Sequence, residues 1–150
     1  MKQTDLAYIA GILDGEGSIS ITNRSTGIKL QGHSLSVSVI NTNEWICKWL
    51  HFNLGGYCRV RVNGLGWGKR DIWEWNVQAR KALYFLELVL PYLRIKRPQA
   101  ELAILFQGHK KKGQHKNPED KSTEEEQRLL MHNYNSGKAK SRDESKRNGI

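Results

Sequence analysis

Two acidic residues, Asp14 and Glu16, alternate with glycines immediately after an apolar run that spans residues 6–13. If this run is helical, both carboxylates lie at the C-terminal end of the helix, where the dipole is already negative. Two acids in such a place need a compensating positive group, and a divalent metal ion is the obvious candidate. A capped core helix that ends in a polar turn is the alternative interpretation, and the spacing alone does not decide between the two.

The apolar run is the element that must position these acids. Residues 6–13 contain no charge and no wholly polar face, which is typical of a buried helix. Ala7 and Gly11 lie four residues apart, so one face is nearly bare of side chains and a second helix could approach it closely. We expect Thr4 to be the N-cap, with Asp5 near the positive end of the dipole.

The segment AYIAGILDGEGS, residues 7–18, resembles the LAGLIDADG signature of homing endonucleases, with Ala10-Gly11 and the acid turn in register. The resemblance implies that this helix packs against its counterpart from a second copy of the chain. It also implies that Glu16, together with the carbonyl of Gly15, holds a catalytic Mg²⁺ in a site that Mn²⁺ or Ca²⁺ can also occupy. The residues expected at the dimer interface are Ala7, Ala10, Gly11 and Asp14.

Two further positions match residues that the family places at its active site. In PYLRIKRPQAEL, residues 91–102, Lys96 corresponds to a lysine beside the site, where it would polarise water or steady the phosphate. Asn41 corresponds to a Gln or Asn that orients water at the end of the second strand, and Asn43 is the alternative. A second basic residue that some relatives carry is not evident, and its candidate substitutes are Lys48 and Arg61.

Alternating and amphipathic segments follow the acid turn. Strict alternation predicts strands over residues 18–24, 34–39, 57–62 and 71–78, the first two joined by a turn over residues 25–32. Helical patterns begin at Asn41 or Thr42 and end near residue 53, with a buried stripe of Trp45, Ile46, Trp49, Leu50 and Leu54. Further helices are predicted over residues 79–90 and 98–107, and from a cap at Ser122 or Thr123 to about residue 134.

This order of elements is similar to that of one LAGLIDADG domain. The expected fold is therefore α+β, a homing-endonuclease αββαββα unit with a four-stranded antiparallel DNA-binding sheet and extra C-terminal helices. Residues 1–112 would form the endonuclease domain. Residues 113–150 would form a basic loop, a C-terminal helix and, from residue 137, a mobile basic tail.

The outward positions of the four strands carry short polar groups and arginines, where exposed strands usually carry many Lys and Glu residues. Ordinary solvent exposure is the alternative, but these groups suit base edges and phosphates in the major groove. The residues predicted to bind DNA from these strands and their loops are Ser20, Thr22, Arg24, Lys29, Ser34, Ser36, Ser38, Arg59, Arg61, Lys69, Arg70, Ile72, Glu74 and Asn76.

Length and charge fit this interpretation. A chain of 150 residues forms one core, and it holds one copy of the signature, so two signature helices can meet only in a homodimer. The net charge of +9 indicates a polyanionic partner. Cys47 and Cys58 are expected to be free thiols, and the absence of a signal peptide or a membrane-spanning run favours an intracellular location, with the organelle undetermined.

The resemblance implies a homodimeric, metal-dependent endonuclease that binds a pseudo-palindromic double-stranded DNA target. By analogy with the family, it would cut across the minor groove, leave short 3′ overhangs and be encoded in a group I intron. The alternative is a binding protein on the same scaffold, either an intron RNA maturase or a cleavage-dead DNA-binding protein. That alternative keeps the basic face but does not require Glu16 or Lys96.

Overall fold

A computed structural model describes residues 1–26, 29–61, 71–110 and 117–137. In order, the elements are α1 (Gln3–Glu16), β1 (Gly17–Thr26), β2 (Lys29–Asn41), α2 (Glu44–Leu54), β3 (Tyr57–Arg61), β4 (Ile72–Gln78), α3 (Ala79–Val89), the 3₁₀ turn η1 (Leu90–Tyr92), α4 (Arg97–Gly108) and α5 (Pro118–Asn135). The predicted α+β order is confirmed.

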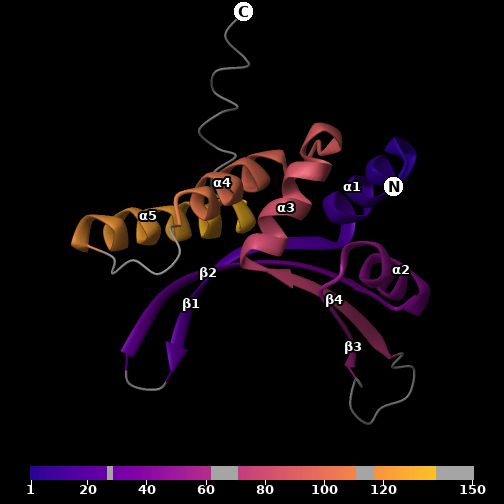
Figure 1. The fold of residues 1–150 in the computed structure, drawn as a ribbon, viewed down its shortest axis with the longest axis horizontal. Coiled ribbons are helices and arrows are strands. Elements are labelled where there is room, and N and C mark those ends of the chain that lie inside the picture. The colour runs from indigo at the N-terminus through magenta and orange to yellow at the C-terminus, as the bar shows by residue number, and fades with distance from the viewer. Residues whose placement is uncertain (27–28, 62–70, 111–116, 138–150) are drawn as a thin grey trace, which may run out of the picture.

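The four strands form one antiparallel sheet in the order β1-β2-β4-β3. In Figure 1 the sheet is curved into an arch, and its two hairpins, β1–β2 and β3–β4, form the two sides of the arch. Alternation sets the two faces, because successive side chains of a strand point to opposite sides. Ile19 of β1, Val37 of β2 and Trp75 of β4 are fully buried on the convex face.

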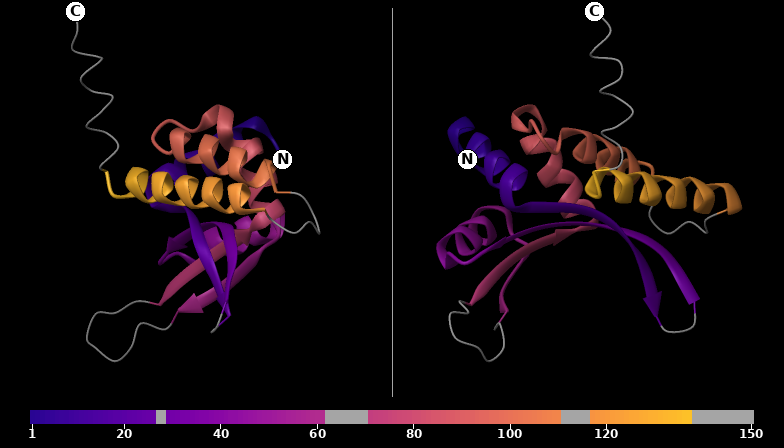
Figure 2. Two further views of the ribbon diagram at one scale, coloured as in Figure 1. Left: turned by 90° about the vertical axis from the view of Figure 1, so that its left-hand side faces the viewer. Right: turned by 180° about the vertical axis from the view of Figure 1, so that it is seen from behind.

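The described helices lie on the convex side of the arch, and none of them covers the concave side (Figures 1 and 2). The core lies between these layers, and the helices contribute apolar side chains such as Leu13 of α1, Phe85 of α3 and Phe106 of α4. Met131 of α5 belongs to the same core, so α5 packs on this layer. The sequence pattern had placed this helix outside the endonuclease domain of residues 1–112. None of the helices in the described part of the chain has the length and apolarity to cross a membrane.

Three helix starts differ from those predicted. Helix α1 begins before Thr4, because the Asp5 carboxylate accepts a hydrogen bond from the backbone N–H of Lys2, which is the N-cap. The N-cap of α2 is Asn43, whose side chain accepts from Trp45 N–H, and neither Asn41 nor Thr42 caps it.

Helix α5 begins four residues before the predicted cap at Ser122. Asn117 and Asp120 form a capping box, with Asp120 N–H donating to Asn117 Oδ1 over 2.7 Å. Pro118 occupies the first turn of this helix, where its missing N–H costs nothing. Ser122 and Thr123 therefore lie inside the helix.

The strands of the first hairpin are longer than predicted, since β1 reaches Thr26 and β2 starts at Lys29. The turn is correspondingly shorter than residues 25–32. A register shift occurs between the pairs Asn23↔His33 and Ser25↔Leu30, where one residue of β1 lies opposite two residues of β2, so the extra residue is in β2. Residues 62–70, between β3 and β4, and the predicted tail beyond residue 137 lie outside the described part of the chain.

The predicted buried stripe of α2 is partly wrong. Leu50 is buried, but Trp45 is 56% exposed, and the fully buried residue of the first turns is Cys47. The helix ends at Leu54, close to the predicted end near residue 53, and Gly55 and Gly56 follow with φ values of 69° and 84° that favour glycine. A Cβ on Gly56 would also lie 2.5 Å from the carbonyl oxygen of Asn76.

Candidate active site and nucleic-acid interface

Asp14, the first acid of the signature turn, is held by three backbone amides of the segment before α4. Its carboxylate accepts from the N–H groups of Arg94 (2.9 Å), Ile95 (3.2 Å) and Lys96 (2.8 Å). Partial burial raises the pKa of Asp14, but these hydrogen bonds and the nearby Lys96 ammonium outweigh it, so the pKa is lowered. Asp14 was predicted at a dimer interface, and its carboxylate is engaged within its own chain.

Glu16, the second acid, is the last residue of α1, and its side chain accepts a hydrogen bond from the side-chain amide of Asn41. The strand register explains this contact. Because Gly17 at the start of β1 pairs with Val39 of β2, the end of α1 lies beside Asn41 at the end of β2. Of the two candidates from the sequence, the structure thus brings Asn41 to Glu16, whereas Asn43 caps α2.

Lys96 lies at the same end of α1. Its ammonium donates to the carbonyl oxygen of Asp14 over 2.5 Å, one residue before Gly15 and two before Glu16. Burial lowers the pKa of Lys96, and the Asp14 carboxylate only partly opposes this, so the net shift is downward. The sequence prediction that residues far apart in the chain meet at the acid turn therefore agrees with the geometry.

The chemistry of this group fits a hard divalent cation that keeps several water ligands. Glu16 offers exposed carboxylate oxygens, and Gly15 offers a backbone carbonyl at the end of a helix. Among the described residues there is no cluster of three or more His, Cys, Asp or Glu side chains that could hold a metal. The carboxylate of Asp14 is already occupied by backbone amides, so Glu16 is the acid of this turn with exposed oxygens.

Both candidates for the second basic residue have partners away from Glu16. Lys48 forms an ion pair with Glu44, and its Nζ lies 5.2 Å from the centroid of the Trp73 ring. Arg61 donates to Glu74 on the sheet.

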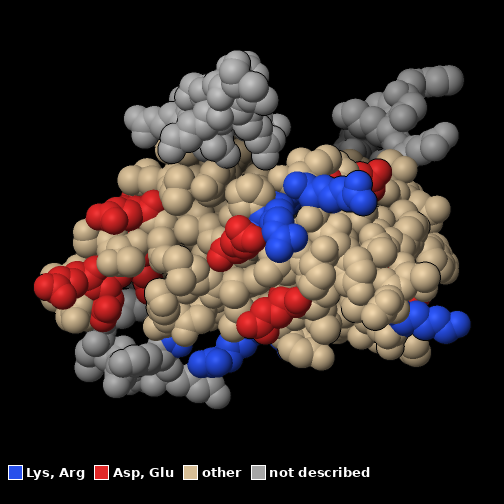
Figure 3. Space-filling view, turned by 90° about the horizontal axis from the view of Figure 1, so that it is seen from above, with Lys and Arg blue, Asp and Glu red and all other residues tan. Residues whose placement is uncertain are grey.

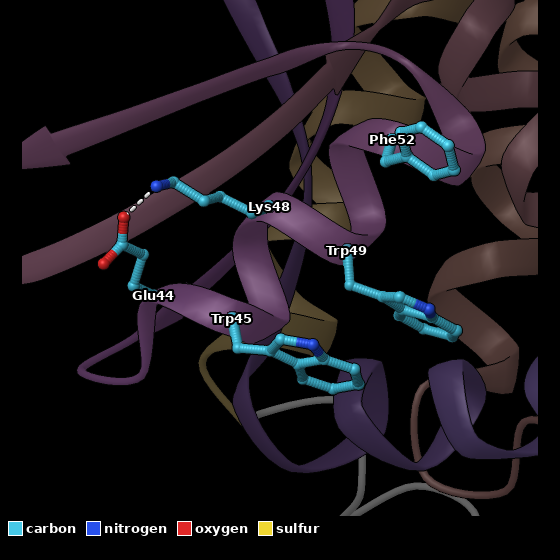
Figure 4. Close-up of a pocket in the computed structure, with 5 residues that line it drawn as sticks. All are labelled: Glu44, Trp45, Lys48, Trp49 and Phe52. Carbon is cyan, nitrogen blue, oxygen red and sulfur yellow. Dashed lines mark ion pairs between the residues drawn. The ribbon is translucent and has the colours of Figure 1, made fainter.

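The exposed face of α1 continues into an aromatic surface on α2, which the sequence pattern had assigned to the core. Gly11 and Gly15 have open space where a Cβ would be. Tyr8 of α1 contacts Trp49 edge-on, with ring centroids 6.0 Å apart, and Trp49 stacks on Trp45 at 5.6 Å. Figure 4 shows both indole rings on one side of α2, with Phe52, which is 87% exposed, further along.

The predicted DNA-binding residues of the strands share the face away from the core. Cross-strand pairs such as Ser20↔Ser36 and Arg59↔Glu74 place them side by side on the concave surface. Asn76 donates to the hydroxyl of Ser36 over 2.9 Å. The described members of this surface are Ser20, Thr22, Ser34, Ser36, Ser38, Arg59, Arg61, Ile72, Glu74 and Asn76.

Two members of this polar surface are buried, although the sequence pattern placed them at outward, exposed positions. Ser34 is 8% exposed and Glu74 is 6% exposed. Arg24 and Lys29 lie in the ends of β1 and β2, where only the backbone is described, and Lys69 and Arg70 lie outside the described residues.

The opposite, helix-bearing face is less suited to a polyanion. Acidic side chains gather at its α5 end (Figure 3). The first half of α5 alone contains Glu119, Asp120, Glu124, Glu125 and Glu126. Repulsion of phosphate by these carboxylates favours the concave face as the nucleic-acid surface.

Sequence reasoning missed the contact that joins α5 to the outer part of β2. His33 lies between two carboxylates, with Nδ1 3.2 Å from Glu124 and Nε2 2.7 Å from Glu125. Arg128 and then His33 lower the pKa of Glu125 to about 2. No local motif marks this cluster, because its members are about 90 residues apart in the chain.

Several solved structures share this fold. The homing endonuclease I-CvuI in complex with its target matches with a TM-score of 0.61 and 29% identity, over 71% of this chain and 67% of that chain. The archaeal intron-encoded homing endonuclease I-Vdi141I, complexed with DNA, matches with a TM-score of 0.71 and 15% identity, over 89% and 86%. The I-SmaMI LAGLIDADG homing endonuclease bound to cleaved DNA matches with 0.65 and 16%, over 83% and 42%.

No protein-family model matches the sequence, and no curated protein matches it. The structural matches nevertheless agree with the signature at residues 7–18, since these neighbours are LAGLIDADG homing endonucleases. The chain has the LAGLIDADG homing-endonuclease fold.

Proposed function

We propose that this chain is a sequence-specific, metal-dependent DNA endonuclease that acts as a homodimer on a pseudo-palindromic target. The observation that carries the proposal is the meeting of Glu16, Asn41 and Lys96 at the end of α1. This site is continuous with β1, the strand that begins the uncovered polar sheet. Structural neighbours that are homing endonucleases complexed with DNA give further support.

The residues of the site suit phosphodiester hydrolysis. A divalent cation bound there would stabilise charge on the phosphate and lower the pKa of a water ligand. Glu16 would hold this ion, with the Gly15 carbonyl as a second ligand. Asn41 fixes the Glu16 carboxylate by donating to one of its oxygens. The ammonium of Lys96, which lies beside the acid turn, can polarise a water molecule or steady the phosphate.

A second copy of the chain would complete the site. Each chain has one exposed carboxylate at the end of α1, that of Glu16, because Asp14 is held by backbone amides. Two such carboxylates meet only if two α1 helices pack together. The bare glycine positions of α1 allow a close approach, and the adjacent aromatic surface of Tyr8, Trp45 and Trp49 would be removed from water in the same contact. Two sites related by a two-fold axis would cut both strands. By analogy with LAGLIDADG homing endonucleases, the cuts would leave short 3′ overhangs, and the chain would be encoded in an intron.

The test begins with selection of bound sequences from a randomised double-stranded DNA library, followed by cleavage assays on the selected target. We expect cleavage of both strands in Mg²⁺ and none in EDTA. Glu16→Gln keeps the size of the side chain but loses its charge, so cleavage should fall by at least about 10³-fold while specific binding persists. Glu87→Gln, at an exposed acid of α3, is the matched control and should cleave normally.

Cleavage by Glu16→Gln at a rate near that of the wild-type chain would contradict the proposed site. Selective DNA binding without cleavage by the wild-type chain would favour a cleavage-dead binding protein. Preference for structured intron RNA over every DNA sequence would favour a maturase.

A further inference from the structure

A buried carboxylate lies on the polar, concave face of the sheet. A negative charge at this place would by itself repel the phosphates of DNA, so its presence needs an explanation. Glu74 of β4 is 6% exposed, and one of its oxygens, Oε2, accepts from two arginines of β3. Arg59 approaches it with Nε at 2.8 Å and an Nη group at 2.7 Å, and Arg61 approaches with Nε at 2.9 Å.

The strand register builds this arrangement. Arg59 is the direct cross-strand partner of Glu74, and Arg61 is the next residue on the same face of β3. The side chain of Glu74 is 8% exposed, whereas those of Arg59 and Arg61 are 61% and 52% exposed. The acid therefore lies beneath the two guanidinium groups, and the arginines form the accessible surface.

The geometry leaves each arginine able to bind a further partner. Glu74 engages Nε of both side chains and one Nη group of Arg59. Among the described residues, no second acid is paired with either arginine. The cluster of three side chains thus keeps a net charge of +1 and outward N–H donors.

An arginine held in this way is better suited to base recognition than a free one. A free surface arginine loses rotamer entropy when a base fixes it, whereas here the ion pair fixes the side chain before DNA binds. The guanidinium fork matches O6 and N7 of guanine in the major groove. Residues two apart on a strand are separated by ~6.6 Å, close to the ~6.8 Å between base pairs two steps apart.

We propose that Glu74 is a positioning residue that holds Arg59 and Arg61 as a fixed pair, which reads two guanines of the DNA target. This proposal rests on the proposed DNA-binding function and specifies how the sheet obtains part of its specificity. Glu74 does not contact a base itself, because the arginines cover it.

The test is selection from a randomised double-stranded library by binding in Ca²⁺, so that the result does not depend on cleavage. We expect Arg59→Ala and Arg61→Ala each to lose a guanine preference of roughly 5- to 150-fold at one position. Glu74→Gln should weaken the preference at both of these positions together. It should also bind random-sequence DNA more tightly, because a negative charge is removed from the surface.

Two further variants separate positioning from other roles. Glu44→Gln removes an acid that pairs with Lys48 on α2, off the sheet, and should leave the selected sequences unchanged. The double substitution Arg59→Lys with Arg61→Lys keeps the charge and loses the forks, so it should retain affinity but lose both guanine preferences. A thermal melt of each variant confirms that it is folded.

A changed preference at a single position unrelated to Arg59 and Arg61 would show that Glu74 contacts a base directly, and would overturn the proposal. Unchanged guanine preferences in the double lysine variant would do the same, because they would indicate phosphate contacts. If the wild-type chain selects a target and Glu74→Gln selects it equally well, this proposal alone is wrong. If the wild-type chain selects no sequence, the proposed function and this proposal fail together.

Discussion

The two acids of the signature turn have different partners, although they are only two residues apart. Asp14 binds three backbone amides of the segment before α4, whereas Glu16 contacts only a side-chain amide among the described residues. A carboxylate saturated by amides is a structural anchor, and one that is exposed and lightly held can bind a cation. This difference supports the assignment of the metal to the later acid.

Loss of Asp14 should therefore act on stability. We expect Asp14→Asn to lower the free energy of unfolding by about 1.5–3 kcal/mol, the range for hydrogen bonds to a charged group. Because the pKa of Asp14 is lower in the folded chain, its contribution is present above about pH 4 and is lost as pH falls through the folded pKa. Urea unfolding at fixed protein concentration should show a large difference between variant and wild type at pH 7, and the difference should shrink as the pH falls below about 4.

Asp71→Asn, at an exposed acid, serves as the control for this measurement and should change stability little. A deficit of Asp14→Asn that stayed constant with pH would show that the charge of Asp14 is not what stabilises the turn.

Lys96 should act on the rate of cleavage more than on binding. Its ammonium is placed on the last turn of α1, so its loss removes an interaction with water or phosphate in the transition state. In single-turnover assays at saturating enzyme, Lys96→Ala should cleave about 10²-fold more slowly or worse, with a small change in Kd. Lys81→Ala, at an exposed lysine of α3, controls for general electrostatic attraction, which would weaken binding and leave the saturated rate intact.

At this scale the sequence predicted the identities of the site residues better than their surroundings. Glu16, Asn41 and Lys96 follow from the signature and two short matches. The burial of Glu74 does not follow from alternation, which only assigns it to the polar face. It depends on the register that places two arginines of β3 over it, and register is set by the whole sheet.

At the scale of elements, the junction between α1 and β1 leaves no room for a side chain at Gly17. A Cβ on Gly17 would lie 2.7 Å from the carbonyl oxygen of Leu13 and 2.8 Å from its Cα, both backbone atoms that cannot rotate away. Its φ of −86° is ordinary, so the requirement for glycine here is one of space.

Gly17→Ala should consequently destabilise the chain by about 1–3 kcal/mol, as overpacking of a core does. Chemical denaturation measures the change. Gly108→Ala is the matched control, because a Cβ there meets no atom within 4 Å, and it should unfold like the wild-type chain. Equal stability of the two variants would mean that α1 can move away from β1 without cost.

Element types were predictable and element ends were less so. Periodicity identified the strands and the helices α2 to α4, and the uninterrupted apolar run of residues 6–13 identified α1. The ends depend on which of several competing caps forms. Asn117 begins α5 because Asp120 completes its capping box, and the capping pattern at Ser122 loses to it. The exposure of Trp45 was missed because helical period alone cannot tell which face meets the sheet.

At the scale of the whole molecule, the exposed face of α1 and the aromatic surface beside it argue for a dimer in the absence of DNA. Gly11→Leu should separate the two α1 helices and yield a monomer, since the open space at Gly11 would be filled by a side chain. Light scattering at micromolar concentration measures the mass. Gly108→Leu is the control and should remain dimeric, and a wild-type chain that is monomeric would remove the basis for a shared active site.

The helix that carries Glu16 runs without a linker into β1, since α1 ends at Glu16 and the strand begins at Gly17. The proposed cutting group and the proposed recognition surface are therefore parts of one continuous backbone, and no side chain fits at Gly17, where they join. If contacts between the sheet and the bases set the register on DNA, the cut then falls at a fixed distance from the contacted bases. Substitutions on the concave face can then change which sequence is chosen without moving the phosphate that is broken. Mutational drift in target choice would leave the geometry of the break, and hence the ends offered to repair, unchanged.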